Sequence, residues 1–227
     1  MKLKSVFRMI GISACLGIQT TSTFAVGPDV QSFLVAKGQE FEQTSTNIPS
    51  LISSNSPFSF YSSIDLSQVG AVTAASLRLP NGKTNQLIDG GEAFEFQQTF
   101  SNKLLLDRIF AKGKYTFTIN TLADGIKSPV LNLTPDAYPP TPHVENWSDL
   151  QAVDSGLPFA VNWNRFVTGS SNDFISCEIS DTNGNPVFST PGMLAVDALD
   201  GTNRFATVLE NTLAPDQTYE GRILFVK

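Results

Sequence analysis

The stretch TLAPDQTYEGRILFVK, residues 212–227, decides how the second half of this chain is interpreted. It contains a turn around Pro215, then Tyr219, then a run in which Ile223 and Phe225 alternate with other side chains. Apolar residues at every second position are typical of a β-strand with one buried face. The stretch therefore predicts a turn, a buried tyrosine and a strand that needs neighbours from elsewhere in the sequence.

Similar alternating runs recur along the 227 residues, separated by Gly, Asn, Asp, Ser and Pro, and they predict an all-β protein. Three of them are FAVNWNRF (159–166), DFISCEISD (173–181) and NRFATVLE (203–210). One helix is expected near residues 101–110, because Leu105, Arg108 and Ile109 recur at helical spacing and Ser101 is placed to cap it. The 17 phenylalanines provide apolar surface for the cores.

A proline-rich segment, PDAYPPTPHV (135–144), divides the sequence. Proline lacks an amide donor and fixes φ, so this segment is expected to be a stiff connector rather than an interior strand. We predict a first β-sandwich domain at 26–135, a linker at 136–142 and a second domain at 143–227.

The first 25 residues have the three-part pattern of a secretory signal peptide. Lys2, Lys4 and Arg8 precede an apolar stretch at 9–18, which is too short to span a bilayer, and Thr23–Ala25 forms a small-x-small cleavage site. We expect cleavage after Ala25 and a secreted, periplasmic or cell-surface protein. An alternative is a lipobox ending at Cys15, in which that cysteine would carry a lipid anchor.

The chain is acidic, with 15 basic and 21 acidic residues and a net charge of −6, which becomes more negative when the signal segment leaves. An acidic surface without a basic cluster argues against nucleic acid and anionic membranes as partners. No stretch is long and apolar enough for a membrane span. Of the two cysteines, only Cys177 remains after cleavage, and its position between Ile175 and Ile179 predicts a buried thiol.

No catalytic, metal or cofactor motif is recognised in the sequence, and no cofactor is expected. His143 is the only histidine and lies in the proline connector, so a histidine-based catalytic or metal site is not indicated. Trp147 lies just past the linker. It is a candidate ligand contact for a carbohydrate, and its alternative role is packing between domains.

The second half resembles a fibronectin type III or similar immunoglobulin-like β-sandwich over residues 141–227. The resemblance implies that Trp163 lies in the core, where alternation also places Cys177, and that Leu213 and Pro215 form the turn before Tyr219. That tyrosine would form a tyrosine corner, in which its hydroxyl bonds to the upstream backbone. The first half shares only the pattern Gly-x-Tyr-x-Phe at 113–117. The whole chain is similar to secreted bacterial proteins made of tandem sandwich domains.

A seven-stranded sandwich needs a G strand beside strand F, and no such strand follows Tyr219 in this sequence. We predict a second domain without its final G strand. Three explanations stay open: a truncated record, an edge covered by the chain's own N-terminal segment, or a strand added at 219–227 by a partner. The expected function is a non-catalytic adhesion or protein-interaction module that binds a protein or cell-surface component. The alternatives are a carbohydrate-binding protein and a secreted hydrolase.

Overall fold

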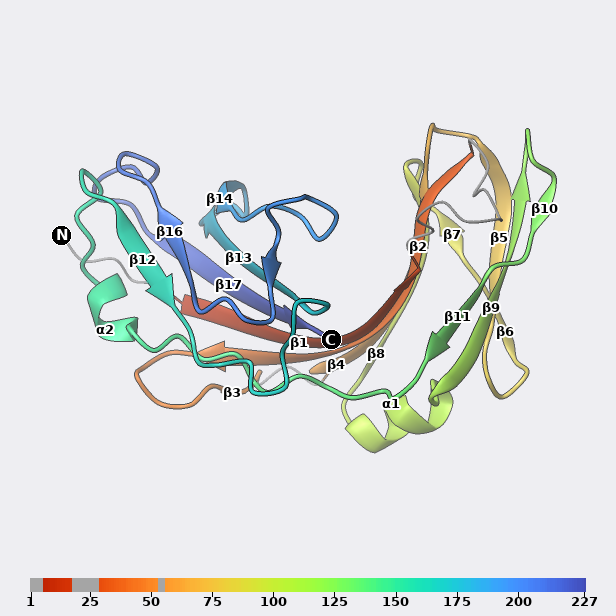
Figure 1. The fold of residues 1–227 in the computed structure, drawn as a ribbon, viewed down its shortest axis with the longest axis horizontal. Helices are drawn as coiled ribbons and strands as arrows, with labels where there is room; N and C mark the ends of the chain where they lie inside the picture. The colour runs from red at the N-terminus through yellow and green to blue at the C-terminus, as the bar shows by residue number, and fades with distance from the viewer. Residues whose placement is uncertain (1–5, 18–28, 53–55) are drawn as a thin grey trace. The chain divides into compact units, whose positions relative to one another are not determined.

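The computed structural model describes residues 6–17, 29–52 and 56–227. Among these residues the secondary structure is mostly β-strand with two short helices, which confirms the all-β prediction (Figure 1). The chain divides into two compact units. The N-terminal unit comprises residues 13–38 and 54–137, and the C-terminal unit comprises residues 1–12, 39–53 and 138–227. The chain passes from one unit to the other within strands β1 (Val6–Gly17) and β2 (Val30–Gln43) and near residues 53 and 137.

Two sheets make up the N-terminal unit. The first has the strand order β2–β4–β8–β7, and the second has the order β10–β9–β5–β6, with β11 also paired to β9. The bounds are β4 Phe58–Leu66, β5 Val72–Arg78, β6 Thr84–Gln86, β7 Ile88–Asp89, β8 Ala93–Phe100, β9 Gly113–Thr121, β10 Ile126–Lys127 and β11 Val130–Leu133. Strands β5 and β6 are joined by the Asn81–Gly82 turn, in which Gly82 has φ +87°, a conformation that glycine adopts without strain.

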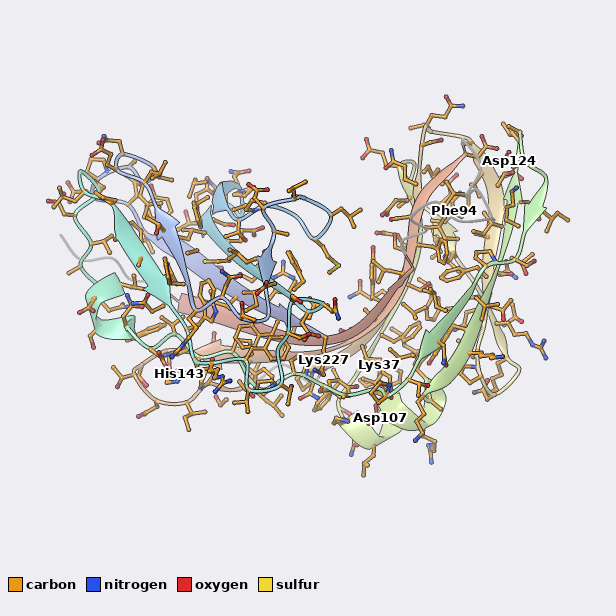
Figure 2. All side chains as sticks on the ribbon, in the orientation of Figure 1. Lys37, Phe94, Asp107, Asp124, His143 and Lys227 are labelled. Atoms are coloured by element: carbon orange, nitrogen blue, oxygen red, sulfur yellow. The ribbon has the colours of Figure 1, made fainter. Side chains whose placement is uncertain are left out.

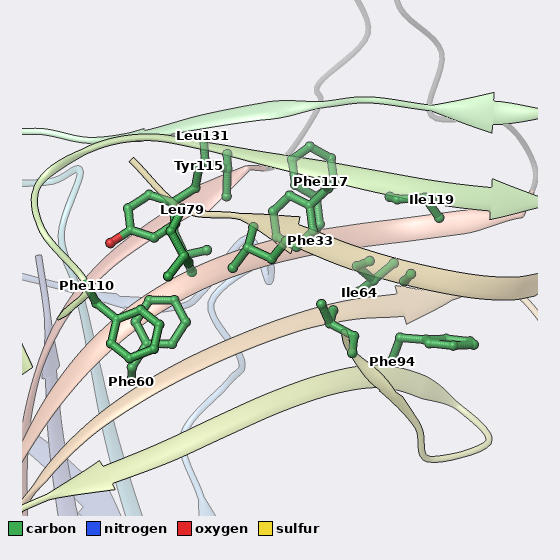
Figure 3. Packing of buried hydrophobic residues seen from close by; sticks show 14 of the residues in the cluster. Phe33, Phe60, Ile64, Leu79, Phe94, Phe110, Tyr115, Phe117, Ile119 and Leu131 are labelled. Atoms are coloured by element: carbon green, nitrogen blue, oxygen red, sulfur yellow. The ribbon is translucent and has the colours of Figure 1, made fainter. Parts of the chain in front are cut away.

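The core of the N-terminal unit takes buried side chains from both of its sheets (Figure 3). Phe33, Phe60 and Phe94 come from the first sheet, and Phe117 comes from the second. Phe60 stacks on Phe110 with ring centroids 3.8 Å apart, and Phe33 meets Phe117 edge-on at 5.5 Å. Two sheets that share one apolar core are compatible with a β-sandwich.

The predicted helix is present as α1 (Lys103–Ile109). Its cap differs from the prediction, because Asn102 rather than Ser101 accepts the hydrogen bond from the amide of Leu104, at 2.7 Å. Asparagine and serine are equally good caps, so the sequence alone does not fix the first residue of the helix.

The C-terminal unit contains β3 (Ser50–Leu51), β12 (Phe159–Asn162), β13 (Phe174–Asp181), β14 (Pro186–Ser189), β15 (Leu199–Asp200), β16 (Phe205–Val208), β17 (Tyr219–Val226) and helix α2 (Trp147–Leu150). Its larger sheet has the order β14–β13–β17–β1–β2, with β15 paired to β13 and β3 to β2. Strands β12 and β16 form a second, two-stranded sheet, and Val144 bridges to Trp163 beside it. Both groups of strands contribute to one buried cluster around Trp163.

The predicted boundaries need one correction: residues 39–53, which the sequence assigned to the first domain, belong to the C-terminal unit. Phe41 packs against the core of that unit. The Gln43 side chain is 1% exposed and bonds to both backbone groups of Val144, donating to the carbonyl at 3.0 Å and accepting from the amide at 2.9 Å. Strand β2 is continuous across the boundary, so its alternation gives no sign that it serves two cores.

Candidate interaction site at strand β17

Strand β17 is held at its start by Tyr219. The tyrosine side chain is 4% exposed, and its hydroxyl accepts a hydrogen bond from the Ala214 amide at 2.8 Å and lies 3.5 Å from the Ala214 carbonyl. Leu213 is buried beneath this turn, whereas Pro215 is exposed on it. Asp216 completes the turn with φ +59°. The phenol therefore fixes where the turn ends and where β17 begins.

Along β17, Tyr219, Gly221, Ile223 and Phe225 face the core, while Glu220 and Arg222 are exposed. Phe225 stacks on Phe166 with ring centroids 4.9 Å apart and an angle of 1° between the planes. The strand is thus half-buried through its side chains. The backbone groups of β17 are paired separately, by one neighbouring strand on each edge.

The two backbone edges of β17 have neighbours of different kinds. On one side β13 pairs antiparallel over the full strand, from Tyr219 opposite Asp181 to Val226 opposite Phe174. On the other side β1 pairs in parallel, from Val6 opposite Glu220 to Ile12 opposite Val226. The N-terminal segment thus lies at the edge where the sequence predicted a missing strand, which is the arrangement of the second explanation above.

Strand β1 falls inside the segment that the sequence predicts to be a signal peptide. The predicted cleavage site, Thr23–Ala25, lies outside the described residues. Cys15 is within β1, and its lipidation stays a prediction. If the signal segment is removed, β17 loses the strand that now covers its second edge.

The core residues that the sequence singled out lie behind this strand. Trp163 is 0% exposed, and its indole Nε1 donates to the Asn203 carbonyl at 3.0 Å. Cys177 is also fully buried on β13 opposite Ile223. Burial, together with the charge of Glu178, raises the pKa of the Cys177 thiol to about 12, so it is not a thiolate at neutral pH.

Trp147 is not an exposed aromatic, contrary to the premise of the carbohydrate hypothesis. It begins helix α2, its side chain is 6% exposed, and it belongs to the same buried cluster as Trp163. The sequence placed it outside any strand and left open a ligand contact or packing between domains, whereas the structure places it on a short helix and in the core of the C-terminal unit. A buried indole offers no face on which a sugar ring can stack.

Other chemistry-bearing groups are sparse in the part of the chain that the structure describes. No three His, Cys, Asp or Glu side chains gather there in a metal-binding arrangement. His143 sits near the backbone, with Nε2 3.3 Å from the Thr46 carbonyl. Neither α1 nor α2, the helices of the described residues, has the length and apolar character needed to cross a bilayer.

One cluster of charged side chains was not predicted from the sequence. The Lys37 ammonium, whose side chain is 0% exposed, lies 2.9 Å from the Asp107 carboxylate (Figure 2). It also lies 2.5 Å from the carboxylate of Asp136. Lys103 also pairs with Asp107, at 2.5 Å. Burial alone would raise the pKa of the Asp107 carboxyl, but hydrogen bonds from Lys103 and Lys37 and the charges of both lysines outweigh it and hold that pKa below its usual range. The available signal was a lysine in the row Phe33, Val35, Lys37, at a position where alternation predicts a core residue.

No family model matches this sequence, and a comparison with curated proteins finds none that is significantly similar.

Proposed function

We propose that this chain is a secreted, non-catalytic interaction protein built from two tandem immunoglobulin-like domains, and that β17 is the strand with which it binds a protein partner. The partner would add a strand to the edge that β1 covers here. Main-chain hydrogen bonds would provide affinity, and the exposed side chains of β17 would contribute to specificity.

The strand orders support the immunoglobulin-like part of this proposal. In the N-terminal unit, the order β2–β4–β8–β7 corresponds to strands A, B, E and D of that fold, and β5, β9 and β11 correspond to C, F and G. In the C-terminal unit, β13 and β17 lie side by side as C and F do, and the hydroxyl of Tyr219 bonds to the upstream turn.

The pairing of β1 with β17 is the single observation that carries the binding proposal. The register runs in parallel over seven residue pairs, from Val6 with Glu220 to Ile12 with Val226. Parallel pairing is slightly less stable per residue than antiparallel pairing. Strand β1 would therefore be held less firmly than an antiparallel strand. If it is removed with the signal segment, one edge of β17 is left with a row of unpaired backbone groups, which is a template for another strand.

A peptide-binding experiment tests this. The chain beginning at Val26 is titrated with a peptide of residues 6–12, and the unfolding midpoint is followed by tryptophan fluorescence. A ligand that binds only the folded state at 100 times its Kd should stabilise that state by about 2.7 kcal/mol. The chain beginning at Met1 should gain little, because its edge is already covered.

The matched control is the same peptide with Ile10 replaced by proline, which removes one amide donor and constrains the backbone. We expect this peptide to lose most of the stabilisation. Equal stabilisation by both peptides would show that binding does not use strand pairing. No stabilisation by the unmodified peptide would show that β17 is not an acceptor, and the proposal would then be abandoned.

A further inference from the structure

The N-terminal unit contains a lysine, Lys37, at a position of β2 where the alternating pattern predicts a core residue. Phe33, Val35 and Lys37 occupy every second position of β2, and the first two lie in the apolar cluster of this unit. Side chains two residues apart on a strand point to the same face. The Lys37 side chain therefore enters the interior, where it is 0% exposed.

Two carboxyl groups meet the Lys37 amine there. Asp107 Oδ1 lies 2.9 Å and Asp136 Oδ2 lies 2.5 Å from Nζ. The other oxygen of Asp136, Oδ1, is buried and accepts no hydrogen bond from the described residues. Asp107 is more open, at 30% exposure, than Asp136, at 12%. These residues are 70 and 99 positions away from Lys37 in the sequence, so the fold alone brings them together.

The environment is apolar and makes separated charges costly. Tyr115, which is 0% exposed, belongs to the core cluster, and its hydroxyl donates to the Ala111 carbonyl at 2.8 Å. Burial raises the pKa of the Tyr115 hydroxyl, and the nearby charges of Asp136 and Asp107 add to the rise. A buried ion pair is stabilising only if its Coulomb energy exceeds the cost of desolvating both charges. Joining amine and carboxyl as a neutral amide would remove two buried charges at once.

We propose that Lys37 and Asp136 condense into an intramolecular amide cross-link, with Asp107 as the group that transfers protons. Because Nζ is 2.5 Å from Oδ2, the carbon of the Asp136 carboxyl is at most one C–O bond farther from the amine. That is close to the separation of about 3–3.5 Å at which reacting atoms are held before attack.

The step balances without an oxidant or a co-reactant. A proton moves from the ammonium to the Asp136 carboxylate, which gives a neutral amine and a neutral acid. The amine Nζ attacks the carboxyl carbon, and the C–N bond forms. Asp107 accepts a proton from nitrogen and returns it to the departing hydroxyl group; the C–O bond breaks and one water leaves. The products are an amide and water.

The mass of the intact chain tests the proposal directly. Folded protein is denatured and its intact mass is measured by mass spectrometry. We expect this mass to be lower by one water than the mass calculated from the sequence. Denaturation separates an ion pair but does not break an amide. A measured mass equal to the mass calculated from the sequence would therefore overturn the proposal. The tryptic digest should contain a branched peptide in which Lys37, protected from cleavage, is joined to the peptide of residues 128–165.

Variants assign the missing water to this site. Lys37→Arg keeps the positive charge but should restore the full mass, and Asp107→Asn should restore most of it; circular dichroism checks that both variants fold. Lys103→Arg is the matched control, because Lys103 pairs with Asp107 but does not supply the reacting amine, and it should still lack one water.

Each contrary result has a defined meaning. A missing water that persists in Lys37→Arg would place the dehydration elsewhere, for example at the Asp89–Gly90 sequence, and would overturn the cross-link. A cross-link that forms fully in Asp107→Asn would overturn the proton-transfer role of Asp107.

Discussion

Strands β9 and β17 each lie inside a sheet of their own unit, but the strands that pair with them are of different kinds. Each begins near a buried tyrosine whose hydroxyl bonds to the preceding turn: Tyr115 donates to the Ala111 carbonyl, and Tyr219 accepts from the Ala214 amide. Each pairs antiparallel with one long neighbour, β5 or β13. Besides β5, strand β9 pairs with β10 and β11, which are local antiparallel strands. Besides β13, strand β17 pairs with β1, a parallel strand from the opposite end of the sequence.

Placing a strand inside a sheet and completing the sheet at its second edge depend on different parts of the sequence. A tyrosine and an alternating run suffice to place a strand at the centre of a sheet. They do not determine what pairs with its free edge. In the N-terminal unit the next dozen residues complete the sheet, while in the C-terminal unit completion depends on a remote segment that the sequence predicts to be cleaved.

The largest expected effect comes from the cores. Trp163→Ala should destabilise the C-terminal unit by about 3–5 kcal/mol, because it leaves a cavity in a fully buried site. Phe117→Ala should cost a similar amount in the N-terminal unit. Both tryptophans of the chain lie in the C-terminal core, so tryptophan fluorescence during guanidinium unfolding reports on that unit, and far-ultraviolet circular dichroism reports on both.

We expect Trp163→Ala, in which Trp147 still reports, to shift the fluorescence transition, and Phe117→Ala to leave it in place. If Phe117→Ala shifted the fluorescence transition as strongly, the two units would unfold as one, and their separate closure would not matter for stability.

A smaller effect concerns pH. Burial raises the pKa of Cys177 from 9.0 to about 12, so above pH 9 the unfolded chain loses the thiol proton while the folded chain keeps it. The unfolded state then binds fewer protons, and the stability of the C-terminal unit should fall by up to about 1.4 kcal/mol per pH unit from this group. Unfolding monitored by fluorescence between pH 8 and pH 11 measures the slope, and Cys177→Ala should make it shallower. An identical slope in Cys177→Ala would show that other groups dominate.

The smallest effect compares the two tyrosines. Tyr219→Phe should cost about 1 kcal/mol, because it leaves the Ala214 amide without its acceptor. Tyr115→Phe should cost less, since it removes a donor from a carbonyl, and a carbonyl has a second lone pair. Thermal unfolding of both variants measures the difference. An unchanged melting temperature in Tyr219→Phe would show that the Tyr219 hydroxyl does not help to position β17.

Local patterns predicted much of this structure. Alternation in DFISCEISD placed Ile175, Cys177 and Ile179 on one face, and all three are buried on β13. The helical spacing near 101–110 predicted α1. These features depend on neighbours a few residues apart, which is the range over which a sequence pattern carries information.

Long-range features could not be predicted in the same way. The sequence pattern of β2 does not show that the strand is divided between two cores at residues 38 and 39. The buried position of Lys37 was not predicted, because its partners Asp107 and Asp136 are 70 and 99 positions away in the sequence. The burial of Trp147 was left open because a single helical turn, α2, is too short to have a recognisable period. In each case the missing information was the identity of a distant neighbour.

The division of β2 also bears on how such a chain can change over evolutionary time. Neither unit is a contiguous piece of sequence, because Phe41 and Gln43 complete a core whose other members lie beyond residue 143. A recombination event at the proline connector would deliver residues 144–227 without those two side chains. Exchange of the halves at this point would therefore leave the C-terminal core incomplete, although the proline-rich segment resembles a domain linker.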